Sequence, residues 1–381
     1  MCKVIIAGDL FPVKNNLYLF TNGDVESLFG EKIRNLFQDA DYRICNLEGA
    51  FSDDEERQEK TGPAIVAPSK AVNAYKALGV DYCLLANNHI TDAGNSGVAA
   101  TMKILDKAGI KHLGAGLDDK SISHYDFLSV GGKKVCLYNV CETMYNKPTA
   151  DKAGAWLYDE YVVCKELESL KSQCDYIIVV YHGGIEKFRY PSPETKKRFH
   201  RMADSGADII LSQHTHCIGC EEYYNGSYLL YGQGDFLLMN FRPKLTALGI
   251  VLELDFEDGI HVKKHLVKCS DNFTLSYVEN PDFHEMEERS QKLGDDTFVY
   301  QQFQQYCQRD LKLYLTAFKS PGLMLRIFRK LLPKQFNQWL YSKAFNRKDL
   351  LFALHTLRSE QNRETAIVGI EQLLDKTVVK Q

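Results

Sequence analysis

Residues 86–94 read Ala-Asn-Asn-His-Ile-Thr-Asp-Ala-Gly, and the fold prediction starts from this stretch. The apolar run at residues 82–85 is typical of a buried strand, and the apolar spacing at residues 97–109 predicts a helix. Asn88 and His89 therefore stand where a strand ends and a helix begins, which is where open α/β sheets bind ligands. An amide oxygen can ligate a metal, and a histidine can ligate or transfer protons. These residue types alone also fit an ordinary turn, so the choice between a turn and a ligand site depends on other parts of the chain.

Four other apolar runs also end at residues that can bind metals. Strands predicted near residues 3–7, 42–45, 175–181 and 208–211 lead to Asp9, Glu48, His182 and the pair His214 and His216. Each of these alone is more often a cap, a turn or a core residue. Because parallel strands bring their carboxyl ends to one edge of a sheet, the five clusters together favour a metal site. The mixture of carboxylate, amide and imidazole suits manganese, iron or zinc, and the number of ligands suits two adjacent ions.

The rest of the chain alternates strands with helices, which predicts an α/β layered fold. We expect helices at residues 68–78, 159–171 and 193–205, the last capped by Ser192, and strands at 110–113 and 133–140. Three runs with alternating apolar residues, at 227–231, 248–254 and 260–267, predict antiparallel strands. Strand signals end near residues 275–281, so we predict an α/β domain over 1–275 and a helical region over 276–381.

Composition narrows the class of protein. The net charge of −4 over 381 residues indicates no general affinity for nucleic acid. The sequence shows no signal peptide and no run of the roughly 20 apolar residues that a membrane helix needs. The eleven cysteines are scattered, so we expect free thiols and a cytoplasmic location. Cys217 and Cys220 form a lone C-x-x-C, for which zinc or redox use is the less common interpretation.

These motifs occur in an order that resembles a known family, the CapA proteins of capsule or poly-γ-glutamate biosynthesis, within the calcineurin-like metallophosphoesterase superfamily. The resemblance covers residues 2–270 and depends on Gly8-Asp9, Asn46-Leu47-Glu48, Asn87-Asn88-His89 with Asp92 and Gly94, His182-x-Gly184-x-Glu186, and His214-x-His216. It implies a four-layer α/β/β/α sandwich with a two-metal site at the strand ends, to which the helical region predicted above would be a C-terminal appendage.

The resemblance also implies a role for each site residue. Glu48 would bridge two divalent metal ions. The other ligands would divide between the ions, with Asn88, His182 and His214 on one and Asp9 and His216 on the other. His89 would be the general acid, Asp92 would orient it or hold the turn, and Glu186 would line the substrate side.

Several positions depart from the pattern of the superfamily. The first motif usually reads Asp-x-His, and Phe11 stands in place of that histidine, so the first ion would have fewer ligands. Gly183 replaces a usual tryptophan and would leave more room beside the site. Ser212 and Thr215 replace a usual glycine and proline in the last motif. Together these departures allow a different substrate.

Two functions follow from the resemblance. The first is a metal-dependent hydrolase, phosphoesterase-like, that acts on a small-molecule or polymer substrate carrying phosphate in capsule, exopolysaccharide or poly-γ-glutamate biosynthesis. The alternative is a non-hydrolytic metal-binding accessory protein of capsule-polymer assembly. Metal-dependent turnover of an aryl phosphate ester would separate them.

The C-terminal region has one further pattern. Residues 311–350 carry nine lysines and arginines and one acid, interleaved with bulky apolar residues at helical spacing. Such a pattern suits peripheral contact with a membrane surface or a polymer-assembly partner. Packing of the apolar face on the α/β core is the more common outcome and the one we favour.

Overall fold

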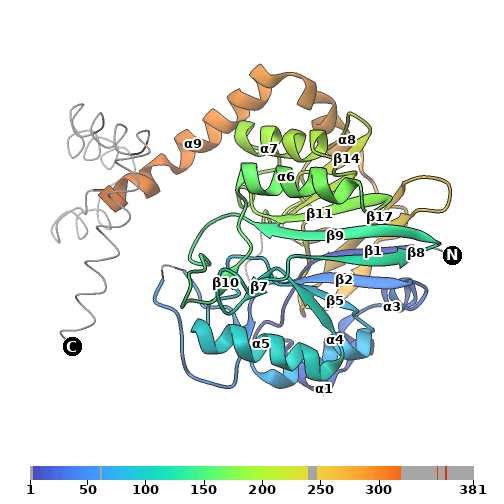
Figure 1. Ribbon diagram of the computed structural model, residues 1–381, viewed down its shortest axis with the longest axis vertical. Coiled ribbons are helices and arrows are strands. Elements are labelled where there is room, and N and C mark those ends of the chain that lie inside the picture. The colour runs from blue at the N-terminus through green and yellow to red at the C-terminus, as the bar shows by residue number, and fades with distance from the viewer. Residues whose placement is uncertain (1–2, 61, 239–246, 319–349, 351–356, 358–381) are drawn as a thin grey trace. The chain divides into compact units, whose positions relative to one another are not determined.

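The computed structural model describes residues 3–60, 62–238, 247–318, 350 and 357, with the backbone alone for 310–318 (Figure 1). Its larger sheet has eight strands in the order β18 (Leu275–Tyr277), β17 (His261–Cys269), β16 (Leu248–Asp255), β1 (Lys3–Leu10), β2 (Tyr42–Leu47), β5 (Tyr82–Leu84) and β6 (Lys111–Leu113), with β15 (Asp235–Leu237) paired to β1. The second sheet has six strands in the order β13 (Glu221–Tyr224), β14 (Ser227–Leu230), β12 (Ile209–Gln213), β11 (Tyr176–His182), β9 (Lys133–Cys141) and β8 (Tyr125–Val130). Two small ladders pair β3 (Ala50–Phe51) with β4 (Val66–Ala67), and β7 (Ala115–Gly116) with β10 (Gly154–Ala155).

The helices lie on the outer faces of these sheets. Those over the larger sheet include α1 (Leu17–Asn22), α2 (Val25–Leu28), α3 (Glu31–Gln38), the 3-10 turn η1 (Ser69–Ala71), α4 (Val72–Leu78) and α5 (Gly94–Ala108). Those over the smaller sheet include α6 (Glu160–Lys171) and α7 (Pro193–Asp204). They are followed in the chain by α8 (His284–Gln291), η3 (Lys292–Gly294) and α9 (Asp296–Phe318). Figure 1 shows α6 and α7 on one outer side and α1, α4 and α5 on the other.

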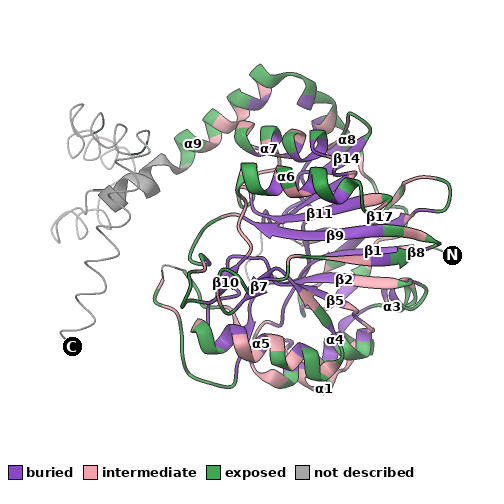
Figure 2. Ribbon diagram, in the orientation of Figure 1, coloured by how far each residue is buried: buried purple, intermediate pink, exposed green. Residues whose placement is uncertain are grey.

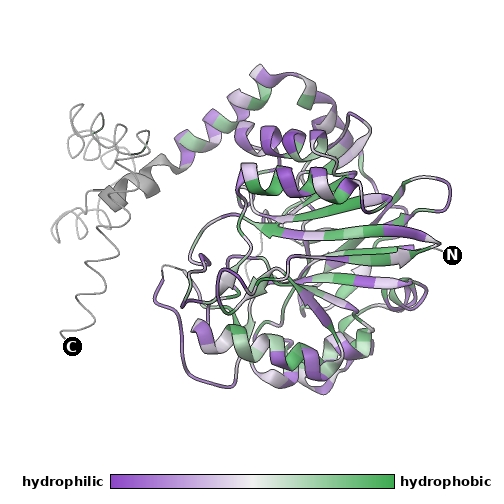
Figure 3. Cartoon of the chain, in the orientation of Figure 1, coloured by the Kyte–Doolittle hydropathy of each residue, from purple (hydrophilic) through white to green (hydrophobic). Residues whose placement is uncertain are grey.

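The core is divided into three buried layers by the alternation of side chains along each strand. In β1, Ile6 faces the second sheet, whereas Ile5 packs under the helices of the larger sheet. In β11, Ile178 faces the first sheet and Ile177 faces the helices α6 and α7. Strands covered on both faces should be apolar throughout, and Figures 2 and 3 show these strands as buried and hydrophobic. The predicted four-layer α/β/β/α sandwich is confirmed.

Most predicted elements are present, and local chemistry explains their ends. Ser192 caps α7, because its hydroxyl accepts the backbone N–H of Thr195 at 3.1 Å and Pro193 follows at the first turn. Asp159 caps α6 in the same way through Val162. One strand differs from its prediction: β14 pairs in parallel with β12 and is antiparallel only to β13. The prediction was wrong because alternation along a strand reports burial of one face and not the direction of its neighbour.

The chain divides into two compact units, Met1–Phe303 and Gln304–Gln381. The first includes α8, from which Arg289 donates to the backbone oxygens of Ile218 and Gly219 at 3.2 and 3.0 Å. The domain boundary predicted near residues 275–281 stays a prediction. So does the membrane hypothesis, since residues 319–349 of the basic and apolar segment lie outside the described part of the chain.

Two further properties bear on the sequence predictions. In the described residues, no helix has both the length and the apolar character needed to cross a membrane. In the described part of the chain, eight cysteines are free thiols: Cys45, Cys83, Cys136, Cys141, Cys164, Cys174, Cys217 and Cys220. Cys217 and Cys220 are buried, and burial raises the pKa of the Cys217 thiol to about 11, which favours the protonated form.

Candidate metal centre

The carboxyl ends of the parallel strands of both sheets meet at one edge of the sandwich. In the larger sheet, Asp9 at the end of β1 is in register with Asn46 of β2 on one side and with Asp235 of β15 on the other. In the smaller sheet, His182 at the end of β11 is in register with Gln213 of β12, directly before His214. The edge therefore brings Asp9 and Asp235 of the larger sheet close to His182 and His214 of the smaller sheet.

Glu48 lies at the centre of this edge. Its side chain is buried, and neither carboxylate oxygen has a hydrogen-bond partner. Oε1 is 3.5 Å from Nε2 of His182, 3.8 Å from Nε2 of His216 and 4.0 Å from Nε2 of His89. Burial raises the pKa of Glu48, because an ionised carboxylate without partners is costly away from water. A bound cation would remove that cost.

His182 and Asn88 lie on one side of Glu48. Nδ2 of Asn46 lies 3.1 Å from Nδ1 of His182, and Nε2 of His182 faces Asn88 Oδ1 at 2.9 Å. His182 is fully buried, and this burial lowers its pKa to about 4. A neutral imidazole beside an amide oxygen is the chemical form that binds a transition metal.

His214 and His216 follow β12 in an unusual backbone conformation. Their φ angles are +84° and +51°, a left-handed region that residues with a side chain seldom adopt. The turn is held by the backbone N–H of His214, which donates to Asp9 Oδ2 at 3.2 Å. Nδ1 of His214 is buried without a partner, and burial lowers the pKa of this histidine. Strain of this kind gathers at functional sites, so the turn supports a role for both rings.

His216 has the opposite electrostatic environment. Its Nδ1 lies 2.7 Å from Asp235 Oδ1 and 3.7 Å from Asp9 Oδ2, while Nε2 faces Glu48. Burial opposes the charged form, but these three carboxylates outweigh it and raise the pKa of His216 well above its ordinary value. The pKa of Asp9 is raised to about 7, first by burial and then by the nearby Glu48.

His89 lies at the outer side of the cluster and is held by Asp92. Nδ1 of His89 is 2.6 Å from Asp92 Oδ2, which also accepts the backbone N–H of Ile65 at 2.6 Å. The other oxygen of Asp92 forms a very short ion pair with Lys60, whose side chain is only 5% exposed. Lys60 Nζ is also 3.1 Å from Nδ1 of His89. The predicted pairing of His89 with Asp92 is present, and Lys60 is added to it.

Lys60 belongs to a strap, residues 56–60, that crosses the turn after β5. Gln58 donates its backbone N–H to the carbonyl oxygen of Asp92 at 2.9 Å and accepts from Thr91 Oγ1 at 2.9 Å. Glu56 accepts from Ser96 Oγ at 2.6 Å. Gly94 lies under the strap with a φ of +66°, a conformation that favours glycine, and a Cβ there would also displace the carboxylate of Glu56. The charge-rich loop is therefore fixed to the turn by alternate residues.

The predicted substrate-side residue, Glu186, is exposed, and its role stays a prediction. Another acid, Glu142, lies nearer to the candidate ligands. It follows β9, with Oε1 3.5 Å from Nε2 of His214 and Oε2 accepting the N–H of Gly184 at 3.4 Å. Burial raises the pKa of Glu142 to about 7, and the charge of Glu186 adds to this effect.

The sequence analysis missed four of these residues as parts of the site: Asn46, Lys60, Glu142 and Asp235. Glu142 directly follows a strand that had been predicted, so the strand-end argument could have found it. Asn46 stands within the quoted motif Asn46-Leu47-Glu48 but was given no role, and Asp235 stands outside all of the quoted motifs. For Lys60 no local signal exists, because its neighbours are other charged residues and its partner is 32 positions away.

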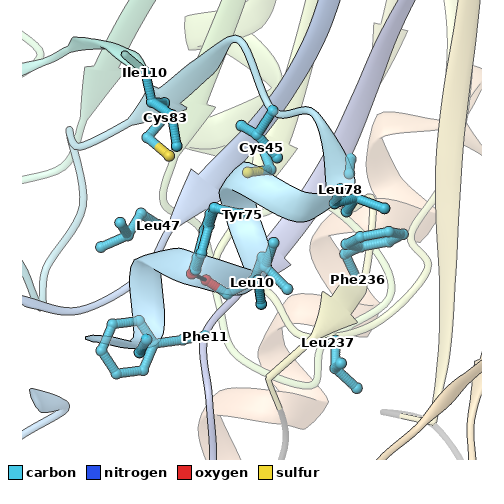
Figure 4. Close-up of a cluster of buried hydrophobic side chains, with 14 of the residues drawn as sticks. Leu10, Phe11, Cys45, Leu47, Tyr75, Leu78, Cys83, Ile110, Phe236 and Leu237 are labelled. Atoms are coloured by element: carbon cyan, nitrogen blue, oxygen red, sulfur yellow. Dashed lines mark hydrogen bonds between the residues drawn. The ribbon is translucent and has the colours of Figure 1, made fainter. Parts of the chain in front are cut away.

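Two departures from the superfamily pattern have a structural explanation. Phe11 is buried in the core beneath the helices, where its ring stacks on Phe51 with centroids 5.8 Å apart (Figure 4). It therefore replaces a ligand by a packing residue. The room expected beside Gly183 is already filled, because a Cβ there would lie 2.7 Å from the ring and hydroxyl of Tyr181. That expectation was wrong, because it ignored the neighbouring side chain.

The residues at this edge fit divalent metal ions. Two groups of side chains have ligand atoms within 4.8 Å of one another, Glu48 with His214 and His216, and Asp9 with His216 and Asp235. Several of their atoms are buried and lack partners: both oxygens of Glu48, Nδ1 of His214 and Oδ2 of Asp235. Buried polar atoms are nearly always satisfied, so these are the positions where ions would be bound.

The fold and the site together form an α/β/β/α sandwich with a cluster of acids and imidazoles at one edge. The family model described as bacterial capsule synthesis protein PGA_cap matches residues 3–240. The chain belongs to this family, as the motifs had predicted.

Curated relatives have related names. The capsule biosynthesis protein CapA of Bacillus anthracis is 28% identical over 245 residues, which cover 58% of this chain and 60% of that protein. A protein of Mycobacterium tuberculosis named as a probable polyglutamine synthesis accessory protein is 29% identical over 208 residues, which cover 51% of this chain and 55% of that protein. The chain thus spans less than two thirds of the length of these relatives.

Solved structures with a related arrangement include a phosphatase of Mycoplasma pneumoniae and a 5'-nucleotidase precursor of Thermus thermophilus. The first is 16% identical, with a TM-score of 0.45, and covers 75% of this chain and 98% of the phosphatase. The second is 13% identical, with a TM-score of 0.36, and covers 82% of this chain and 59% of the nucleotidase.

Proposed function

We propose that this protein is a metal-dependent hydrolase of phosphoesters that acts on a small-molecule or polymer substrate in capsule, exopolysaccharide or poly-γ-glutamate biosynthesis. The observation that carries the proposal is Glu48, a buried carboxylate with no hydrogen-bond partner and three imidazoles within 4.0 Å of Oε1. Removing a carboxylate from water without compensation costs several kcal/mol, of the order of the penalty for any buried ion. Two divalent ions sharing Glu48 would supply the missing charge.

Each predicted ligand then has a part. Glu48 would be shared by two ions, with Asn88, His182 and His214 toward one and Asp9 and His216 toward the other. When bound, such ions would polarise a phosphoryl group and lower the pKa of water in the site. The paired acids and imidazoles suit manganese, iron or zinc.

His89 is suited to proton transfer. Its Nδ1 is engaged by Asp92, which leaves Nε2 directed to the side of Glu48. The His89 side chain is 15% exposed, whereas His182 is not exposed at all, so His89 can reach a substrate. The protonated ring would give its Nε2 proton to the leaving oxygen, while Asp92 balances the charge.

The biosynthetic setting comes from the relatives. Proteins named for capsule biosynthesis and for polyglutamine synthesis match the region that holds these motifs. The word accessory in the name of the mycobacterial relative keeps a non-hydrolytic role as the second candidate.

The test is hydrolysis of p-nitrophenyl phosphate and bis-p-nitrophenyl phosphate with added manganese, alongside elemental analysis. We expect His89→Ala to lower turnover by about 10²–10⁴-fold with its metal retained, because it removes only the proton donor. His182→Ala should lose both turnover and metal. His261→Ala, at an exposed position, is the matched control and should change neither.

Two results would decide against hydrolysis. Tight metal binding with no turnover on a panel of phosphate mono- and diesters would favour the accessory role. Equal loss of metal in the His89 and His182 variants would make His89 an ordinary ligand.

A further inference from the structure

The candidate ligands for the two ions are unequal in number, and the deficit lies on the side of Asp9. The histidine of the usual Asp-x-His motif is absent there, since Phe11 stands in its position and packs in the core. Asp9 and His216 would be the only ligands besides the shared Glu48. The structure places another carboxylate beside them, and the family resemblance gave that residue no role.

That carboxylate belongs to Asp235. β15 pairs in parallel with β1, and the register places Asp235 directly beside Asp9. In-register residues of neighbouring strands project to the same face of a sheet, so both carboxylates reach the same side. The ligand atoms of Asp9, His216 and Asp235 lie within 4.8 Å of one another. Asp235 is only 5% exposed, as a ligand of a buried ion should be.

The two oxygens of Asp235 have different environments. Oδ1 is 2.7 Å from Nδ1 of His216 and orients that ring. Oδ2 is buried without any partner. A residue that only oriented His216 would use one oxygen and leave the other exposed to water or bonded, because a buried carboxylate oxygen without a partner is costly.

We propose that Asp235 is a ligand of the ion on the Asp9 side, bound through Oδ2, and that it takes the place of the histidine replaced by Phe11. This inference rests on the proposed two-metal centre. Asp235 would then act twice, as a ligand and as the residue that orients His216, an arrangement that carboxylates around metal-bound histidines commonly have. An additional carboxylate in place of an imidazole makes this side more anionic and favours harder ions such as manganese.

The test is metal titration of the full chain with manganese, followed by electron paramagnetic resonance. Asp235→Asn keeps an oxygen that can accept from His216 Nδ1 and removes the negative charge and the second oxygen. We expect two ions in the wild type and a weaker site reduced in affinity by about 10–100-fold in the variant, with the tighter site unchanged. The spectrum of coupled manganese pairs should change to that of single ions. Asp258→Asn, at an exposed position, is the matched control.

Other outcomes would overturn the inference. If Asp235→Asn binds both ions as the wild type does while Asp235→Ala loses one, Asp235 only orients His216. If both variants bind both ions normally, Asp235 has no part in the metal centre. A wild type that takes up no manganese, iron or zinc would instead refute the proposed function itself, so the two failures are distinct. Circular dichroism of each variant checks that the fold is retained.

Discussion

The two groups of side chains that flank Glu48 are built from similar residues and have opposite electrostatics. Around Asn88, burial dominates and lowers the pKa of His182 and His214, so their imidazoles are neutral. Around Asp9, carboxylates dominate and raise the pKa of His216. Histidine is thus a neutral ligand on the side of Asn88, whereas on the side of Asp9 it is a partner of carboxylates. The difference arises from the neighbours of each ring, since His214 and His216 both follow β12 but only His216 lies beside Asp235 and Asp9.

The largest expected effect comes from Glu48, which both groups share. Glu48→Gln should reduce metal content from about two ions to less than one, because it removes the charge common to both positions. Without metal, the same change should stabilise the fold. The pKa of Glu48 is raised in the folded state, so the wild type without metal loses stability as pH rises above the unfolded value, and the glutamine variant should not.

Thermal melting in a chelator, at about pH 5 and about pH 8, measures this effect. The gap between the variant and the wild type should widen at the higher pH and amount to roughly 1–2 kcal/mol. The exposed Glu257→Gln serves as control. Equal metal content in Glu48→Gln and wild type would remove Glu48 from the centre.

The pH dependence of metal binding should differ between the two groups of side chains that flank Glu48. On the anionic side, Asp9 has a pKa of about 7 and must lose its proton to bind a cation. On the neutral side, His182 has a pKa of about 4 and is ready at neutral pH. Affinity of the Asp9 side should therefore fall by about tenfold per pH unit below pH 7, whereas the other side should be less sensitive.

Calorimetric titration with manganese in two buffers of different ionisation enthalpy would count the protons released. Release of at least one proton near pH 6 by the weaker site, and of fewer by the tighter site, is the expected result. Identical pH profiles for both sites would show that the two groups of ligands do not differ in protonation.

The smallest effect concerns the strap over the turn that carries Asn88. Lys60→Met removes the buried ion pair with Asp92. The hydrogen bonds that Asp92 accepts from the backbone N–H groups of Gln58 and Ile65 should then open more often. We expect amide hydrogen exchange in residues 58–66 to rise by about 10–100-fold. Lys120→Met, at an exposed position, should change nothing. The side chains around Asp9 should keep their metal affinity. Loss of both ions would show that the strap also stabilises the ligands around Asp9.

Whether a site residue could be predicted from the sequence depends on how far apart along the chain the interacting residues lie. Asp9, His182 and His214 were found because an apolar strand precedes each of them, and the parallel pairing of such strands follows from the α/β pattern. The proximity of Asp235 to Asp9 could not be found in this way, since it depends on the pairing of β15 with β1 across more than 200 residues. Lys60 and the filled space beside Gly183 depend on side-chain packing between segments, which no local pattern encodes.

The hydrogen bond from His214 to Asp9 joins residues 205 positions apart, and it also joins the two sheets. Closing so long a loop costs conformational entropy, so contacts of this range form slowly. The ions would therefore find their full set of ligands only after the two sheets have met. Which metal the protein carries would then be decided after folding, by the ions that the cell keeps available at that moment, so a chain produced under manganese starvation should fold normally and mature with a different metal.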